Sequence, residues 1–188
     1  MMIDKAKVER AVQLFLEGIG EDVNRDGLRG TPARVAEACT EIFKGVGLDP
    51  TTAMEFCSAP NQDEMILVRD IPFYSICEHH LLPFFGKAHV AYIPNEDRIA
   101  GFSSLVRVIE TMAKRPQMQE RLTTEIADTL VASLEPKGIV VVIEAEHMCL
   151  TMRGVKKPGS LTVTSAMRGI MRKEATRAEA FALIKGRR

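Results

Sequence analysis

Residues 139–149, IVVVIEAEHMC, begin with five consecutive β-branched apolar residues and end in a histidine and a cysteine. A short run of this kind is typical of a buried strand. Three further β-rich runs lie at residues 65–68, 84–94 and 161–165, and two helical patterns lie between residues 94 and 139. Strands with a pair of inserted helices predict an α+β fold, in which helices pack on one face of a mostly antiparallel sheet.

A helical segment precedes the predicted sheet. Apolar residues recur at helical spacing over residues 4–18, and a second helix opens at Thr31-Pro32 and should turn Val35, Ala38 and Ile42 inward. A polar connection follows at residues 49–63. We therefore expect one structural unit, with an N-terminal helical segment over residues 1–60 and a sheet domain over residues 61–188.

Composition and charge exclude several classes of protein. The 25 Lys and Arg residues balance the 25 Asp and Glu residues, whereas nonspecific nucleic-acid binding usually needs a basic excess. No apolar run approaches the ~18 residues of a membrane-spanning helix, and the first residues lack a secretory signal pattern. We expect a cytoplasmic protein with no nucleic-acid or membrane partner. A chain of 188 residues can build its core without a metal, so a bound metal would serve chemistry.

The segment Cys77-Glu78-His79-His80 is the densest group of metal-ligand types in the chain. Zinc prefers thiolate and imidazole ligands, and a catalytic site uses three protein ligands with water in the fourth position. Cys77 and His80 are spaced to reach one ion, and Cys149 is a candidate third ligand. Because side chains alternate along a strand, we expect His147 and Cys149 to share a face. Cysteine is also common as a small buried hydrophobe, and spacing alone supports both interpretations equally.

A second set of residues suits an anionic ligand. Arg107 and Arg153 carry guanidinium groups, which contact phosphate oxygens bidentately, and the helix start at Ser103 offers free backbone N–H groups. For any one such residue, a solvated surface position is the more common role. Gln119 and Glu120 also leave two interpretations open. Glu120 is either an ordinary first-turn helix charge or an acceptor for the N–H groups of a guanine ring.

Several longer motifs carry a resemblance to a known family. They are GTPARVA at residues 30–36, CEHH at 77–80, YIP at 92–94, RPQMQERLT at 115–123, and EHMC at 146–149 running into MRGV at 152–155. In this order, and across nearly the whole chain, they resemble GTP cyclohydrolase I of the zinc-dependent type. The resemblance implies a tunnelling fold, in which antiparallel sheets of several subunits join into a barrel, and it makes residues 61–188 the catalytic domain.

The resemblance also implies an activity, a cofactor and an assembly. The activity is the hydrolytic opening of the guanine imidazole ring of GTP, which gives 7,8-dihydroneopterin triphosphate and formate. This is the first step of tetrahydrofolate and pterin biosynthesis, a branch of one-carbon metabolism. Zinc is the implied cofactor, and a homodecamer with sites shared between subunits is the implied assembly.

The same resemblance assigns roles to individual residues. The implied zinc ligands are Cys77, His80 and Cys149, and the implied proton-transfer residues are His79 and His147. The remaining implied contacts are to substrate: Ser103 to the ribose within the catalytic site, Gln119 and Glu120 to guanine, and Arg107, Arg153 and Arg34 to the triphosphate.

The chain departs from the family pattern at Ser104, where lysine is usual. Loss of that charge should weaken triphosphate binding about ten- to a hundredfold unless another cation compensates. Three alternatives follow: a paralogous cyclohydrolase that prefers another guanine nucleotide, a noncatalytic zinc-binding regulator on the same scaffold, and a tunnelling-fold nitrile reductase with a cysteine nucleophile. The presence of His79 and His147 argues against the regulator, and the full metal set argues against the reductase.

Overall fold

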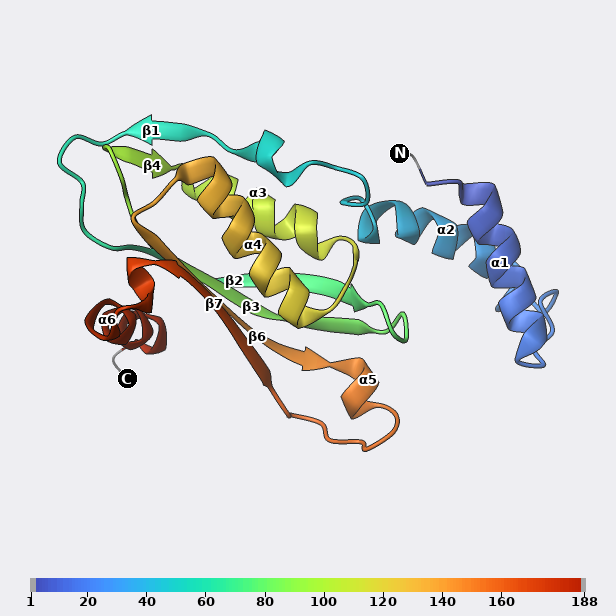
Figure 1. Ribbon diagram of the computed structural model, residues 1–188. Helices are drawn as coiled ribbons and strands as arrows, with labels where there is room; N and C mark the ends of the chain where they lie inside the picture. The colour runs from blue at the N-terminus through green and yellow to red at the C-terminus, as the bar shows by residue number, and fades with distance from the viewer. Residues whose placement is uncertain (1–2, 187–188) are drawn as a thin grey trace.

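The computed structural model describes residues 3–186 of the chain (Figure 1). None of the helices in this range is both long and apolar enough to cross a membrane. In chain order, the elements are α1 (Lys5–Gly18), α2 (Thr31–Ile42), the 3-10 helix η1 (Pro50–Ala53), β1 (Phe56–Ser58), β2 (Ile66–Cys77), β3 (Pro83–Ile93), β4 (Arg98–Ala100), α3 (Phe102–Ala113), β5 (Pro116–Gln117), α4 (Gln119–Leu134), β6 (Gly138–His147), α5 (Met148–Thr151), β7 (Thr162–Gly169), the 3-10 helix η2 (Ile170–Arg172) and α6 (Glu174–Lys185).

A five-stranded sheet forms the centre of the molecule, in the order β5-β2-β3-β6-β7. All neighbouring strands are antiparallel except the short β5, which runs parallel to the end of β2. The predicted α+β class with a mostly antiparallel sheet is therefore confirmed. β2 is much longer than the predicted run at residues 65–68, because it continues through a bulge between Val68 and Ile71 and ends at Cys77.

Helices α3 and α4 cover one face of the sheet, as the sequence predicts (Figure 1). Burying a large apolar side chain contributes ~1.5–3 kcal/mol, so the layer between helices and sheet holds both helices in place. The opposite face carries a smaller apolar cluster, in which Met171 and Ala180 from the C-terminal segment pack near Val140. Fully buried residues of the main layer include Tyr92, Leu105, Ile109, Leu122, Ile126, Leu130, Ile139 and Ile143.

Helices α1 and α2 pack on one another beyond the end of the sheet (Figure 1). Gly45, just after α2, makes the close approach to the rest of the chain. Its N–H donates to the carbonyl of Lys114 at 3.0 Å, and its own carbonyl accepts from Nε of Arg115 at 2.9 Å. A Cβ at position 45 would lie 1.9 Å from the carbonyl oxygen of Thr111, so only glycine fits there.

The apolar faces of these two helices are exposed in the single chain. Val35 is 36% exposed and Ile42 is 40% exposed, and Ala38 is exposed as well, so the expectation that these residues face inward is wrong within this chain. On α1, Leu14 is 59% exposed and Phe15 is 65% exposed. The helical spacing does produce two helices, and Leu16 on α1 and Ala36 on α2 are buried, but the described part of the chain leaves the rest of their apolar surface uncovered.

A buried histidine lies in the middle of β3, on the sheet face away from α3 and α4. Nδ1 of His89 accepts a hydrogen bond from the backbone N–H of Asp70, a bulge residue with a φ of 59°, at 3.1 Å. Nε2 therefore carries the proton of the neutral ring, and it has no hydrogen-bond partner within residues 3–186. Burial lowers the pKa of His89 from its ordinary value of 6.5, against the opposing effect of the Glu144 and Asp70 carboxylates.

We expect this histidine to make stability depend on pH. With the pKa of His89 lowered in the folded state, the unfolded chain binds the proton more readily, so stability is present above about pH 6.5 and is lost as pH falls below it. His89→Gln keeps an acceptor for the Asp70 N–H and cannot titrate. Urea unfolding at pH 7, 6 and 5, with both proteins metal-free, should show a smaller loss of unfolding free energy in the variant. Equal losses would refute the prediction.

Candidate metal centre and active site

The turn between β2 and β3 folds back on Cys77. The carbonyl of Cys77 accepts from the N–H of Leu81 at 2.8 Å, and its N–H donates to the carbonyl of Leu82, also at 2.8 Å. Leu81 has a φ of 53°, which lets the chain reverse within a few residues. This closed turn brings the imidazole of His80 to the side chain of Cys77, as the spacing of the two residues predicts.

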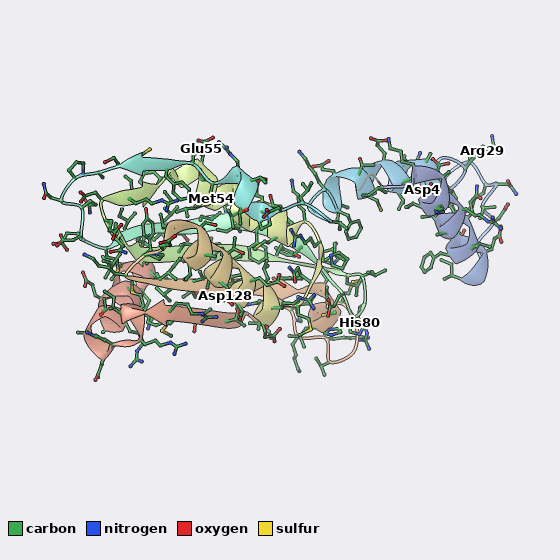
Figure 2. All side chains as sticks on the ribbon, turned by 45° about the horizontal axis from the view of Figure 1, so that its top comes forward. Asp4, Arg29, Met54, Glu55, His80 and Asp128 are labelled. Atoms are coloured by element: carbon green, nitrogen blue, oxygen red, sulfur yellow. The ribbon has the colours of Figure 1, made fainter. Side chains whose placement is uncertain are left out.

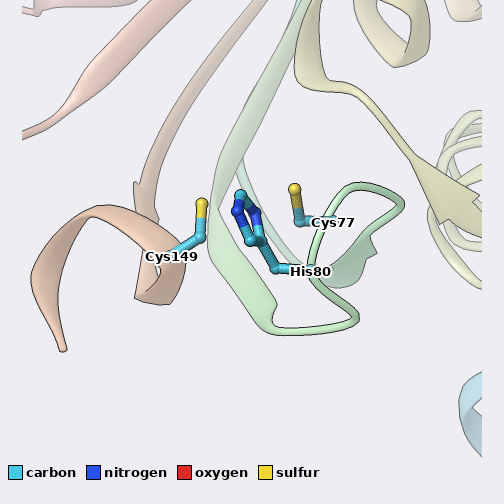
Figure 3. A group of neighbouring side chains, drawn as sticks. All are labelled: Cys77, His80 and Cys149. Atoms are coloured by element: carbon cyan, nitrogen blue, oxygen red, sulfur yellow. The ribbon is translucent and has the colours of Figure 1, made fainter. Parts of the chain in front are cut away.

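Cys149 reaches the same place from the end of β6. The strand ends at His147, and Cys149 lies in the one-turn helix α5. The expectation that His147 and Cys149 share a strand face is therefore wrong, because the chain turns into a helix before the second residue. The ligand atoms of Cys77, His80 and Cys149 nevertheless all lie within 4.8 Å of one another (Figure 3).

This group of three side chains fits a zinc ion. Two thiols and one imidazole are zinc ligands, and three protein ligands leave the fourth tetrahedral position open. Burial, followed by the nearness of Cys77, raises the pKa of the Cys149 thiol. Two thiolates side by side are costly without a cation, and a divalent cation removes that cost. Three converging ligand atoms favour a metal site over isolated buried cysteines.

His147 is held by a cross-strand neighbour and by a buried amide. Its ring stacks parallel on Phe84, its partner in the β3–β6 register, with ring centroids 4.7 Å apart. Nε2 of His147 lies 2.7 Å from Oε1 of Gln119. The amide nitrogen of Gln119 donates to the carbonyls of Ile143 and Thr162, at 3.0 and 2.9 Å, which fixes the direction of the amide. Since an amide oxygen only accepts, Nε2 of His147 is the protonated nitrogen.

Gln119, which the resemblance assigns to guanine, is almost fully enclosed by protein and borders the cavity beside His147. Its side chain is 1% exposed, and both ends of its amide bond to protein groups. The neighbouring Glu120 is exposed at the start of α4. A cavity of about 240 Å³ lies here, lined among others by Cys77, His79, Glu120, His147 and Cys149. Burial lowers the pKa of His147, and Glu120 acts in the opposite direction.

Comparison with known proteins identifies the family of the chain. A family model described as GTP cyclohydrolase I matches residues 8–185. The chain belongs to the GTP cyclohydrolase I family. It is 62% identical to a protein named GTP cyclohydrolase 1 from Pelotomaculum thermopropionicum, over 98% of this chain and 99% of that protein. A second protein of that name, from Carboxydothermus hydrogenoformans, is 60% identical over 97% of this chain and 96% of its own length.

Among solved structures, the chain is similar to an archaeosine synthase described as QueF-like, in its apo form. The TM-score is 0.45 and the sequence identity is 15%, over 56% of this chain and 93% of that one. Membership of the GTP cyclohydrolase I family itself makes the protein a hydrolase.

Not all residues expected in a GTP cyclohydrolase I site come together in this chain. Ser103 and Arg107 lie at the start of α3, where Nη2 of Arg107 donates to Oγ of Ser103 at 3.3 Å and Nη1 contacts Glu55 at 3.3 Å. Figure 2 shows Glu55 well apart from His80. Arg34 lies on α2, where Nη2 donates to Oγ1 of Thr31 at 3.0 Å. Of the expected triphosphate contacts, only Arg153 is close, with Nη1 at 3.0 Å from Nε2 of His80.

Ser104, where the resemblance led us to expect lysine, is fully buried at the start of α3. Its hydroxyl accepts from the backbone N–H of Glu55 at 3.0 Å. The serine therefore links α3 to the segment before β1. A lysine here would have to move its ammonium group out of this buried position to reach any ligand.

Phe84, Glu78 and Arg121 also contribute to the site, although their sequence pattern does not predict it. Phe84 stacks on His147 because the β3–β6 register places the two residues opposite one another, and this register cannot be derived from the sequence alone. Glu78 and Arg121 both lie inside the quoted motifs, but their meaning depends on a contact between them across 43 residues.

We expect loss of one thiol to weaken zinc binding. Purified protein should hold about one zinc per chain, and Cys149→Ser should lose more affinity than the ~10–100-fold typical of changes to residues that only orient ligands. Cys57→Ser is the matched control, since Cys57 is exposed on β1 outside the metal group. Elemental analysis after gel filtration with a competing chelator measures the difference. Equal retention of zinc by the two variants would contradict the assignment.

Proposed function

We propose that this protein is a zinc-dependent GTP cyclohydrolase I, which opens the guanine imidazole ring of GTP to give 7,8-dihydroneopterin triphosphate and formate. The observation that carries the proposal is the convergence of Cys77, His80 and Cys149 beside the cavity that His147 and Glu120 line. The product would enter a pterin pathway such as tetrahydrofolate synthesis. A cytoplasmic location accords with free thiols as ligands and with a nucleotide as substrate.

Zinc bound by these three residues would lower the pKa of a bound water to about 7, and so make a hydroxide available for attack on the ring carbon. His147 holds a proton on Nε2 against Gln119, which leaves Nδ1 as the atom that gains or gives a proton. A lowered pKa keeps the ring neutral, and therefore a competent base, near pH 7. His79, whose Nδ1 lies 3.7 Å from Sγ of Cys77, is the second proton-transfer group.

Glu120 is the side chain best placed to recognise guanine. It is exposed at the first turn of α4 and lines the cavity next to His147. A carboxylate can accept two parallel N–H groups, which is the pattern that N1 and the exocyclic amine of guanine present. Arg153 adds a guanidinium group beside His80 for the triphosphate.

We also propose that the site is completed by another subunit. Within residues 3–186, β7 pairs on one side only, and most of β2 beyond its contact with β5 is an open edge. Ser103, Arg107 and Arg34 lie away from the metal group, as substrate contacts from a second copy would. The exposed apolar faces of α1 and α2 support the same view. The proposed assembly is the family's homodecamer. In each subunit, residues 1–60 form an N-terminal segment and residues 61–188 form the catalytic domain.

The function is tested by formate release and pterin absorbance. Zinc-loaded protein is given GTP, GDP or guanosine at equal concentration, with a chelated control. We expect turnover that is fastest with GTP and is abolished by the chelator. Faster turnover of GDP or guanosine would favour a paralogue with another nucleotide preference. No turnover with zinc bound would favour a noncatalytic regulator.

The variant Gln119→Ala distinguishes two roles of Gln119: holding His147 in place and contacting guanine. If the amide only holds His147, the variant should lose about 10- to 100-fold in kcat, part of the 10²–10⁴-fold that a positioned acid–base group supplies, with little change in KM. Glu120→Gln is the comparison and should mainly raise KM for GTP. A normal kcat and a raised KM in Gln119→Ala would instead indicate that Gln119 contacts guanine.

A further inference from the structure

An ion pair ties the metal-binding turn to the start of α4. Glu78 lies directly after the ligand Cys77, and its carboxylate receives two hydrogen bonds from Arg121. Nη1 of Arg121 donates to Oε1 at 3.3 Å, and Nη2 makes a short contact with Oε2. Two parallel contacts between planar groups fix direction as well as distance. A single contact would leave the carboxylate free to rotate.

The arginine is itself held in place. Nε of Arg121 donates to Oε1 of Gln117 at 3.1 Å. Gln117 is 2% exposed, and its amide nitrogen donates to the carbonyl of Met112 at 3.3 Å and to Oε2 of Glu125 at 3.1 Å. The guanidinium group is therefore oriented by a buried amide whose own direction is fixed.

The backbone of the turn is bound to the same segment. The N–H of Glu78 donates to the carbonyl of Gln117 at 3.0 Å, and Cys77 pairs with Gln117 in the short parallel β2–β5 ladder. Both the main chain and the side chain of Glu78 are thus attached to residues 117–121. An exposed ion pair by itself adds little stability, and both partners here are partly exposed, so stability is a poor explanation for this arrangement.

Three consecutive residues at the start of α4 contact three parts of the site. Gln119 bonds to His147, Glu120 lines the cavity, and Arg121 holds Glu78. Successive residues on a helix point about 100° apart, so one rigid helical turn can reach in three directions. The relative position of the metal turn, His147 and the guanine contact is then set by this single turn.

We infer that Arg121, acting through Glu78, is a positioning residue that holds the Cys77–His80 turn against the start of α4. The inference rests on the proposed function, because it assigns the two residues to the zinc-binding turn of that site. Without the pair, Cys77 and His80 are less well oriented for one ion, and the turn moves independently of Glu120. The consequence is weaker zinc binding together with a lower kcat.

Zinc affinity without substrate is the first readout. Competition with a chromophoric chelator should show a 10- to 100-fold loss for Arg121→Ala and for Glu78→Gln, the range found when residues that orient metal ligands are changed. Arg121→Lys should recover part of the loss, because ammonium keeps the charge but not the planar fork. The double variant should lose no more than either single variant, because both changes remove one interaction.

Cobalt substitution gives a second readout, since the visible absorption of bound Co²⁺ reports ligand geometry. Arg121→Ala should change this spectrum. Asp128→Asn is the matched control: it breaks another ion pair of α4, in which Nε of Arg168 lies 2.7 Å from Oδ1, and Figure 2 shows Asp128 apart from His80. The control should leave both zinc affinity and the cobalt spectrum unchanged.

The outcomes separate the inference from the proposed function. Wild-type zinc affinity and an unchanged cobalt spectrum in folded Arg121→Ala would overturn the positioning role. If that variant does not fold, Glu78→Gln carries the same test, and its wild-type affinity would overturn the role equally. A different result is also possible: the variants lose zinc affinity, and the zinc-loaded wild-type protein does not convert GTP. That result would support the positioning role and refute the proposed function.

Discussion

The register between β3 and β6 is the constraint on which the site depends. It places Phe84 opposite His147, so the first residues after the metal-binding turn lie beside the last residues of β6. Cys77 and His80 lie at the turn before β3, and Cys149 follows β6, so this pairing brings Cys149 to the end of the sheet where the turn holds the other two ligands. A slip of one residue would turn His147 to the other face and away from Gln119.

The sequence predicts the elements whose pattern is regular, and it fails where a regular pattern stops. α3 and α4 follow from their helical patterns, and most of β6 follows from its continuous apolar run. β2 is underpredicted because the bulge at Arg69 and Asp70 and the proline at position 72 interrupt the expected alternation. Cys149 is misplaced onto a strand for a related reason: alternation describes a strand but does not say where the strand ends. The ligand set survives this error because a helical turn also points Cys149 inward.

Pairwise contacts within the site lie beyond what a single sequence contains. Gln119 and His147 are 28 residues apart, and the direction of the amide is set by a carbonyl on β6 and a carbonyl on β7. A glutamine next to a glutamate suggests one recognition pair, but the two side chains differ in burial, since Gln119 is 1% exposed and Glu120 is exposed at the start of α4. Both residues line the cavity, but hydrogen bonds to acceptors fix the amide of Gln119, whereas the side chain of Glu120 is exposed.

On α1 and α2, the spacing of apolar residues predicts that these faces are buried, but it does not identify the surface that would cover them. Val35 and Ile42 have the spacing of core residues, yet they are exposed within residues 3–186. Arg34, Ser103 and Arg107 present a similar case. Their residue types suit one nucleotide site, but within one chain they lie apart from the metal group. Both discrepancies have a common physical solution if apolar faces and cations from another copy meet the site described here. In the proposed assembly, contacts between subunits would cover the apolar faces and bring together the cations that residues 3–186 of one chain leave apart.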